Sequence, residues 1–309
     1  MDTIAMIREK ARQRQKTLVF PEYDDPRVAQ AAKILEREGI VKPLLLTPDK
    51  MDADEKEKYS REYYELRKIK GIDLDTARKT LEDPLYYAAM MTRSGKVDGL
   101  VAGAAHTTSD VARASLQCLG VDERLMIACS CFVMVVPDCP YGAEGTFVYA
   151  DCGLVPDPNS RQLACIAVLA AELASKILHL TPKVALLSYS TKGSAKGRSI
   201  DRIVEALSLA KAMAPDIIID GELQVDAAVV PQVAQIKCPD SPLGGNANVL
   251  IFPNLDAGNI GYKLIQRLAK ARAVGPLILG LNKPCSDLSR GCSSEDVIDC
   301  AAITALRAQ

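Results

Sequence analysis

Short apolar runs rich in β-branched residues alternate with longer helical patterns along most of the chain, and this alternation limits the fold more than any other feature. Such alternation is typical of a parallel sheet covered by helices on both faces. The expected strands are 18–20, 43–47, 99–102, 132–136, 147–150, 184–187, 217–219, 249–252 and 277–279. A chain of 309 residues is long enough for two such units. The sequence therefore predicts an α/β fold of two domains.

The segment that follows strand 18–20 has the local signals of a βαβ unit. Asp25 can cap a helix, and Pro26 suits the first helical position. Apolar residues then recur at helical spacing and predict the buried face of this helix: Val28, Ala31, Ala32 and Leu35. Gly39 is the expected stop, and strand 43–47 completes the unit.

The segment 129–150 is β-rich and has no helix between its strands. Pro137, Pro140 and Gly142 mark a turn within it, so antiparallel pairing is expected here. We interpret this segment as the passage between the domains. The first α/β domain is then expected to comprise residues 1–128 plus 295–309, and the second residues 129–294.

The charge balance argues against a polyanionic partner, and the hydropathy pattern argues against a membrane anchor. Lys and Arg number 38 against 39 Asp and Glu, so no global basic field exists to hold nucleic acid. The longest apolar stretch, 163–171, is far below the roughly 20 residues of a spanning helix. Residues 1–4 begin a charged, amphipathic segment without an apolar signal core, so we expect a cytoplasmic protein.

The ten cysteines are expected to be reduced core thiols. Cys118, Cys129, Cys131, Cys152 and Cys165 lie within apolar or strand-like runs. Cys129 and Cys131 would share one face of a strand, but no second Cys/His pair at zinc spacing accompanies them. We therefore expect no metal.

A cysteine nucleophile is also disfavoured. Cys152 and Cys292 lie near polar segments, yet His106 and His179 fall in other parts of the chain. Neither histidine makes a recognisable Cys/His pairing, so an acyl-cysteine intermediate is not expected.

The loop 190–197, Ser-Thr-Lys-Gly-Ser-Ala-Lys-Gly, follows an expected strand and precedes an expected helix. Its backbone N–H groups, hydroxyls and ammonium groups are suited to phosphate, which makes Ser190 and Lys192 candidate substrate-binding residues. The alternative is an ordinary loop between strand and helix. Neither the Walker pattern nor the dinucleotide GxGxxG pattern occurs, so kinase and dehydrogenase readings lack their usual motif.

The densest polar run, 282–296, follows the expected strand 277–279. Asn282, an Arg fork, several hydroxyls and a carboxylate at this position are suited to an anionic substrate and a proton transfer. The alternative concerns Asp296, because Ser293 and Asp296 have the spacing of a helix capping box. Spacing alone favours capping.

This polar run resembles that of a known family. The run Gly-Leu-Asn-Lys-Pro-Cys-Ser-Asp-Leu-Ser-Arg-Gly-Cys at 280–292 resembles the signature of the phosphate acetyltransferases. Collinear matches extend through the chain at 64–71, 108–117, 188–196, 220–228, 246–249 and 258–263. This many matches in register are specific to the family in a way that one motif is not.

The resemblance implies the architecture and the chemistry. The fold would consist of two α/β/α domains with a cleft between them, similar to the isocitrate dehydrogenase-like fold, and the protein would be a homodimer. The reaction would transfer an acetyl group reversibly between coenzyme A and inorganic phosphate. Coenzyme A would be a substrate, and no cofactor would be tightly bound.

The resemblance also assigns residue roles by motif match. Asp296 would be the general base for the coenzyme A thiol, Ser289 would hydrogen-bond at the reacting centre, and Arg290 and Arg113 would bind phosphate and its developing charge. Ser289 and Arg290 would also contact coenzyme A, and Arg67 and Lys263 resemble further substrate-binding positions.

Three alternatives remain open from the sequence. A phosphate butyryltransferase would share the loops and accept a longer acyl chain. A non-catalytic module binding acyl phosphate or coenzyme A would keep the loops without turnover. A metal- and NAD-dependent decarboxylating dehydrogenase of similar architecture would need an acidic metal cluster that the sequence does not show.

Overall fold

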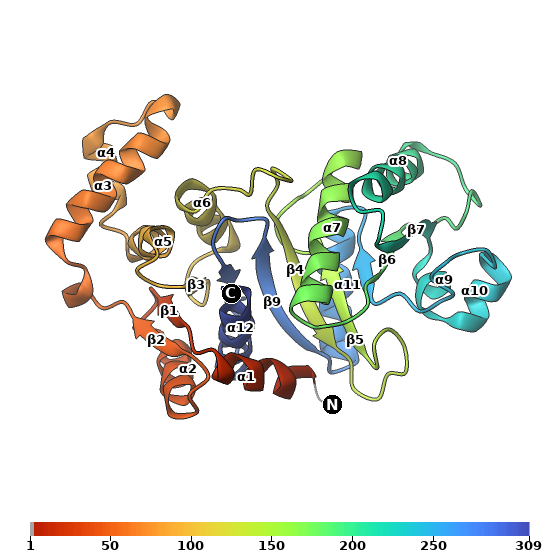
Figure 1. Cartoon of the computed structure of the whole chain (residues 1–309), viewed down its shortest axis with the longest axis horizontal. Helices are drawn as coiled ribbons and strands as arrows, with labels where there is room; N and C mark the ends of the chain where they lie inside the picture. The colour runs from red at the N-terminus through yellow and green to blue at the C-terminus, as the bar shows by residue number, and fades with distance from the viewer. Residues whose placement is uncertain (1–2, 309) are drawn as a thin grey trace. The chain divides into compact units, whose positions relative to one another are not determined.

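The computed structural model describes residues 3–308; residues 1–2 and 309 lie outside the described residues. The chain divides into two compact units, Met1–Ala128 with Gly280–Gln309, and Cys129–Leu279 (Figure 1). Residues 280–294 were expected in the second domain, whereas the structure groups them with the first unit. The reason is a strand that the sequence analysis missed, because Cys285–Asp287 pairs with Gly99–Ala102.

Parallel strands form the sheet of the first unit, in the order β2-β1-β3-β10. These strands are β1 Thr17–Phe20, β2 Lys42–Leu45, β3 Gly99–Ala102 and β10 Cys285–Asp287. The helices are α1 Thr3–Gln13, α2 Pro26–Arg37, α3 Ala53–Arg67, α4 Leu74–Thr80, α5 Pro84–Ser94, α6 Thr108–Cys118 and α12 Ser294–Arg307, with short 3₁₀ turns η1 Pro48–Lys50 and η2 Lys68–Lys70.

The helices of the first unit cover both faces of this sheet (Figure 1). On one face α12 packs against α1 and α2 and against β3, and on the other face α5 packs against α6 and β3. Helices α3 and α4 pack on each other, and α3 contacts α5 and α6. All strands of this sheet are parallel, so the loops after β1, β3 and β10 emerge at one edge.

Helix α2 forms as the sequence analysis predicted. The Asp25 side chain accepts a hydrogen bond from the Arg27 N–H, and Pro26 occupies the first turn. Its buried residues are Val28, Ala31, Ala32 and Leu35. The helix ends before Gly39, whose φ of 66° lies in the left-handed region that glycine adopts readily.

The sheet of the second unit is mixed, in the order β9-β4-β5-β8-β6-β7. Its strands are β4 Cys129–Val135, β5 Thr146–Ala150, β6 Lys183–Leu187, β7 Ile218–Leu223, β8 Val249–Ile251 and β9 Arg272–Leu279. Its helices are α7 Ser160–Lys176, α8 Arg198–Met213, α9 Val225–Val229, α10 Pro231–Lys237 and α11 Leu255–Leu268.

The antiparallel pairing expected for 129–150 is confirmed, because β4 pairs antiparallel with both β5 and β9. Strands β5, β8, β6 and β7 then pair in parallel. Helices α7 and α8 pack together, with α7 against β5, β6 and β8, while α11 packs against β4, β5 and β9. Strand β9 is longer than the sequence analysis expected, since pairing with β4 begins at Arg272 and continues past Pro276.

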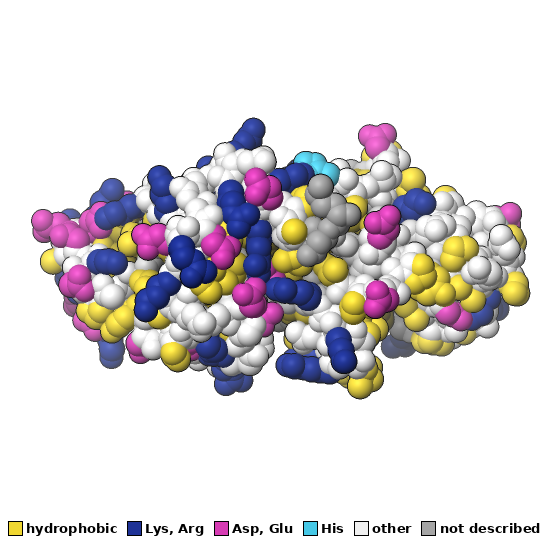
Figure 2. Space-filling view, turned by 90° about the horizontal axis from the view of Figure 1, so that it is seen from below, with side chains coloured by type: hydrophobic (Ala, Val, Ile, Leu, Met, Phe, Trp, Pro, Cys, Tyr) yellow, Lys and Arg dark blue, Asp and Glu magenta, His cyan; other side chains and the backbone are white. Residues whose placement is uncertain are grey.

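The distribution of surface charge and the burial of the cysteines agree with what the composition predicted. Figure 2 shows basic and acidic side chains intermingled on the face drawn. All ten cysteines carry free thiols, and each except the partly exposed Cys139 is buried. Among the described residues, no helix is both long and apolar enough to cross a membrane.

Candidate active site

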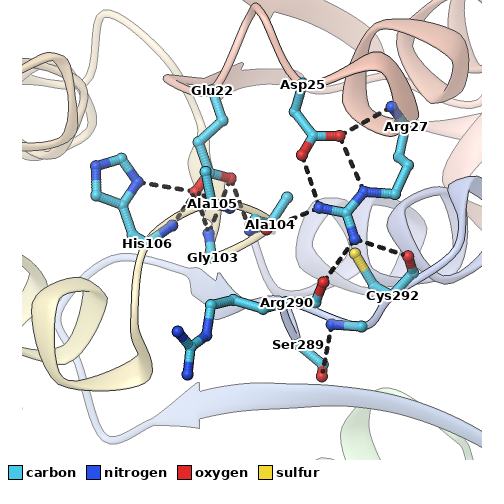
Figure 3. A network of polar contacts seen from close by, with 11 residues as sticks. Glu22, Asp25, Arg27, Gly103, Ala104, Ala105, His106, Ser289, Arg290 and Cys292 are labelled. Atoms are coloured by element: carbon cyan, nitrogen blue, oxygen red, sulfur yellow. Dashed lines mark hydrogen bonds and ion pairs between the residues drawn. The ribbon is translucent and has the colours of Figure 1, made fainter.

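Loops that follow β1, β3 and β10 meet at one edge of the first unit's sheet (Figure 3). Each loop leads into a helix, α2, α6 or α12. The N-cap residues Asp25, Thr107 and Ser293 satisfy a backbone N–H of their own helices. Helix N-termini carry partial positive charge, so their convergence suits this edge to an anionic ligand.

The buried carboxylate of Glu22 organises the loop after β3. It accepts hydrogen bonds from the consecutive N–H groups of residues 103–106 at 2.8–3.1 Å, and from the His106 ring Nδ1 at 2.8 Å. Burial alone would raise the pKa of Glu22, but the hydrogen bonds from His106 and the backbone outweigh burial and lower it. The same ion pair raises the pKa of His106. This loop is therefore a nest of N–H groups already filled by a protein anion.

Arg27, in the first turn of α2, joins the three loops (Figure 3). Its guanidinium forms a bidentate pair with Asp25 and donates to the carbonyl oxygen of Ala104 at 2.8 Å. It also donates to the carbonyl oxygens of Arg290 at 2.7 Å and Cys292 at 3.1 Å. Arg27 thus fixes the backbone of the 288–293 loop relative to the other two loops.

Asp287, the last residue of β10, is fully buried directly before this loop. Neither carboxyl oxygen has a hydrogen-bond partner among residues 3–308. Burial raises the pKa of Asp287 to about 7; the nearby Thr108 side chain opposes this shift, and the charge of Glu22 adds to it. The site therefore contains two buried carboxyl groups in opposite environments: Glu22 accepts several hydrogen bonds, whereas Asp287 has the Thr108 side chain near it and no backbone donor among residues 3–308.

The structure brings Ser289, Arg290 and Asp296 together at this edge, as the sequence predicted from one continuous run. Ser289 and Arg290 are exposed. Within residues 3–308 the Arg290 guanidinium has no ion pair, while its carbonyl is held by Arg27 (Figure 3). An exposed cation on a fixed backbone is suited to an incoming anion.

Asp296 is a capping residue, as its spacing from Ser293 predicted. Its carboxylate Oδ2 accepts from the Ser293 N–H and from the Ser293 hydroxyl, each at 2.8 Å, and the Ser293 Oγ accepts from the Asp296 N–H at 3.2 Å. Both hydrogen bonds to the carboxylate go to the same oxygen. The capping role therefore leaves Oδ1 available to another donor.

The other predicted residues of the first unit lie on or near α6. Arg113 is exposed on α6 and pairs with Asp110 one turn earlier, at 3.2 Å. Arg67 ends α3 beside Tyr63, whose hydroxyl donates to Gln117 of α6. The Asn282 side chain donates to the Leu119 carbonyl just after α6 at 3.2 Å, so it anchors its own segment to this helix.

In the second unit, protein carboxylates occupy the phosphate-like loop 190–197. The Ser190 hydroxyl and the Gly193 N–H both donate to Glu222 at 2.8 Å. The Lys192 ammonium pairs with the buried Asp220 at 2.5 Å. The groups that made this loop a candidate phosphate site are thus engaged within the unit, because its anion is supplied by the next strand, β7. Lys263 is exposed on α11, over the ring of Tyr262.

Glu22, Arg27 and Asp287 were not predicted from the sequence as site residues, and His106 was considered only as a partner for cysteine. One signal was available, since Glu22 and Arg27 follow strand 18–20 and therefore lie at the same sheet edge as the 282–296 run. Their partners are mainly backbone groups about 80 or more residues away, which side-chain patterns do not reveal. Among residues 3–308, no group of three or more His, Cys, Asp or Glu side chains is arranged to hold a metal ion.

The thiols near these segments are poorly suited to nucleophilic attack. Burial raises the pKa of Cys292 to about 11, although Arg27 opposes the shift. Burial also raises the pKa of Cys152 well above its usual value, and Asp151 adds to the shift. Thiols with raised pKa values are weak nucleophiles near neutral pH because the thiolate is the reactive form.

Comparison with known proteins identifies the class. A family model described as "Phosphate acetyl/butaryl transferase" matches residues 2–305, and the chain belongs to this family of acyltransferases. The resemblance seen in the sequence is thereby confirmed.

Individual members of the family are similar to this chain over its full length. A phosphate acetyltransferase of Acetivibrio thermocellus is 47% identical, over 100% of this chain and 99% of the relative. A phosphotransacetylase from Streptococcus pyogenes superposes with a TM-score of 0.92 at 39% identity, covering 99% of this chain and 98% of that one. One from Staphylococcus aureus gives a TM-score of 0.88 at 38% identity, over 100% and 98%. The predicted α/β fold is confirmed.

Proposed function

We propose that this chain is a phosphate acetyltransferase that passes an acetyl group reversibly between coenzyme A and inorganic phosphate. The observation that carries the proposal is the full-length similarity to proteins named for this activity, at up to 47% identity. The site geometry supports it, since an exposed Arg290 lies at a sheet edge where helix N-termini converge.

In the proposed mechanism the acyl phosphate binds at this edge. The Arg290 fork and the N-termini of α6 and α12 provide donors and positive charge for phosphate oxygens. Arg113 adds a second cation. To bind substrate it would give up its exposed ion pair with Asp110, which is weak because solvent screens it. Ser289 lies beside Arg290 with its hydroxyl exposed, in position to donate to the substrate. Arg67 and Lys263 remain proposed substrate contacts from the family resemblance. Asn282, Ser190 and Lys192 remain proposed contacts from the polar loops that carry them, and Ser190 and Lys192 would first have to exchange their bonds to Glu222 and Asp220.

We assign proton removal from the coenzyme A thiol to Asp296. The two capping bonds both go to Oδ2, so Oδ1 can accept the thiol proton while the cap persists. A thiol with pKa near 8.5 is only about 3% ionised at pH 7, so full ionisation gains roughly 30-fold. Alignment of the thiol with the acyl phosphate supplies the larger share, through effective molarities of roughly 10⁵ M or more.

Transfer is proposed to be direct. The coenzyme A sulfur forms the bond to the acetyl carbon, the bond from that carbon to the phosphate oxygen breaks, and phosphate leaves. The raised pKa values of Cys292 and Cys152 support this route over an acyl-cysteine. Coenzyme A is thus a substrate and not a bound cofactor.

The test is thiol consumption by the purified chain with acetyl phosphate and coenzyme A. The proposal expects thioester formation, and the Arg290→Ala variant should lower kcat/KM by roughly 10- to 100-fold, the value of one charged hydrogen-bonding group. Arg37→Ala is the matched control, because Arg37 is exposed on α2 and, among residues 3–308, pairs with its neighbour Glu38 alone. Binding of coenzyme A without thiol consumption would reject the enzyme and indicate a binding module. Faster turnover of butyryl than acetyl phosphate would reassign the acyl group.

We also propose a cytoplasmic homodimer. Reduced cysteines persist in the cytoplasm, in agreement with the ten thiols of this chain.

The proposed dimer rests on helix α11. On α11 the apolar side chains Ile260, Leu264 and Leu268 follow one another at helical spacing and are 57%, 52% and 79% exposed. Such a stripe is suited to a second copy of the chain. Light scattering should give twice the monomer mass, and Leu264→Arg should reduce it to the monomer value.

A further inference from the structure

Asp287 differs from the other buried carboxylates of this chain. Glu22 accepts from four backbone N–H groups and a ring nitrogen, Asp151 from three backbone N–H groups and from the N–H and hydroxyl of Ser130, and Glu222 from Ser190 and Gly193. Asp287 is as deeply buried as these groups, yet neither of its oxygens has a hydrogen-bond partner within residues 3–308. A buried ionised carboxylate without donors is costly, so the group favours the protonated state.

The packing around Asp287 explains why no backbone donor reaches it. Asp287 pairs in register with Ala102, and the Leu288 N–H donates to the Ala102 carbonyl at 2.6 Å. The carboxyl group lies against the backbone of Gly103, where a Cβ would come within 2.2 Å of Oδ1. The N–H of Gly103 is already engaged by Glu22. The N–H of the residue against which Asp287 packs therefore serves the other carboxylate.

The charged groups around Asp287 also disfavour its ionisation. From the β1 loop, Glu22 accepts from the Gly103 N–H and presents a negative charge to Asp287, and the partner of Glu22 is the His106 ring. From α6, the Thr108 side chain alone favours the ionised form, while within β10 the Cys285 thiol is itself buried. These surroundings and the depth of burial raise the pKa of Asp287 to about 7.

We propose that Asp287 is a positioning residue that, as a neutral carboxylic acid, holds the Ser289–Arg290 turn in the geometry that binds substrate. Loss of its proton then lowers the affinity of the site for the acyl phosphate. The proposal rests on the function proposed above. An ionised Asp287 would place a second negative charge beside Glu22 with nothing to pair it. Movement of the 288–293 loop or of the start of α6 would relieve this repulsion, and these are the elements that carry Arg290 and the helix N-termini.

The experiment compares the wild type with Asp287→Asn, which keeps the shape of the neutral acid and removes the titration. KM for acetyl phosphate and kcat are measured from pH 5.5 to 9, a range that extends to both sides of the pKa of Asp287. The wild type should show KM rising about 10-fold as pH increases through about 7, while Asp287→Asn keeps a low KM across the range. Asp216→Asn, an exposed carboxylate of the second unit, is the matched control and should follow the wild type. The same rise in Asp287→Asn as in the wild type would overturn the proposal.

A second variant retains the carboxyl group and guards against misfolding of the first. Thr108→Val removes the side chain that favours ionisation, so it should move the KM transition to higher pH. An unchanged or lowered transition would count against the proposal.

A third measurement is independent of activity. Infrared difference spectra between wild type and Asp287→Asn at pH 6 should contain the carbonyl band of a protonated acid, and the band should disappear by pH 8.5. Its absence at pH 6 would refute the proposal for Asp287 even if acetyl transfer is found. If the band is present but no acetyl transfer occurs at any pH, the proposed function fails and Asp287 remains a neutral acid.

Discussion

The guanidinium of Arg27 donates to the carbonyl oxygen of Arg290 at 2.7 Å, across 263 positions of sequence. The same group reaches Ala104, Cys292 and Asp25, so one side chain holds the loops after β1, β3 and β10 in a fixed arrangement. The position of the Arg290 backbone therefore depends on a residue that need not touch substrate.

Arg27→Lys should impair the site even though it keeps the charge. An ammonium group cannot reproduce a bidentate pair with Asp25 and bonds to three carbonyls at once. We expect a loss of about 1–3 kcal/mol in the free energy of unfolding and a rise in KM for acetyl phosphate of roughly 10-fold. Denaturant unfolding and steady-state kinetics measure the two effects. Arg37→Lys on the same helix should change neither, and wild-type kinetics in Arg27→Lys would show that the turn holds its shape unaided.

Glu22→Ala should be the most destabilising single change at this edge. Removing the carboxylate leaves the N–H groups of residues 103–106 without the partner that now satisfies all of them. With a cost of about 1–3 kcal/mol for each buried unsatisfied donor, partly relieved by water, we expect a loss of at least about 3 kcal/mol in the free energy of unfolding. Urea titration measures it. Glu36→Ala, exposed on α2, serves as control, and a loss below about 1 kcal/mol would mean that the nest does not depend on its anion.

The parts of the site that the sequence predicted are those with local signals. Asp25 and Pro26 set the start of α2, and the spacing of Ser293 and Asp296 set the start of α12, because capping involves residues two or three positions apart. The missed strand β10 is three residues long and lies inside a polar run, so it has no apolar pattern. These residues form a strand because their backbone pairs with β3, which lies beside them in the sheet.

The filled nests were not predictable for a related reason. In the loop 190–197 the hydroxyls and ammonium groups suggested an external phosphate, but Glu222 and Asp220 supply the negative charge from a strand about 30 residues later. A nest selects a negative charge and does not specify its source. Only the tertiary structure distinguishes a nest that awaits a ligand from one filled by the protein.

His106 should make stability depend on pH through its pair with Glu22. Its pKa in the folded chain is raised above 6.5, first by the hydrogen bond to Glu22, so the folded state holds this proton more tightly than the unfolded state. The stabilisation is complete below pH 6.5 and is lost as pH rises through the raised pKa. The lowered pKa of Glu22 has the opposite effect, giving stability above pH 4.5 that is lost on acidification through the lowered value.

The measurement is the thermal midpoint from pH 5 to 9 for His106→Asn against wild type. The variant should be less stable than wild type at pH 5.5, and the difference should shrink as pH rises above 6.5. His179→Asn is the matched control, because Asn tolerates the positive φ of 56° found at His179. A difference that stays constant with pH would show that the His106 ring contributes packing alone.

Asp296→Asn separates the base from the cap. Asp296 is the N3 residue of the capping box, and the side-chain oxygen of an asparagine there can still accept from the Ser293 N–H and hydroxyl, so the thermal midpoint should change little. Its amide cannot accept a proton from the coenzyme A thiol, so kcat should fall by roughly 10²–10⁴. Raising the pH toward 9 should recover part of the loss, because the thiol then ionises without help. Asp52→Asn, at the exposed N-cap of α3, reports the cost of an aspartate-to-asparagine change at the start of a helix away from the site. Near-normal turnover in Asp296→Asn would leave Asp296 with the capping role alone.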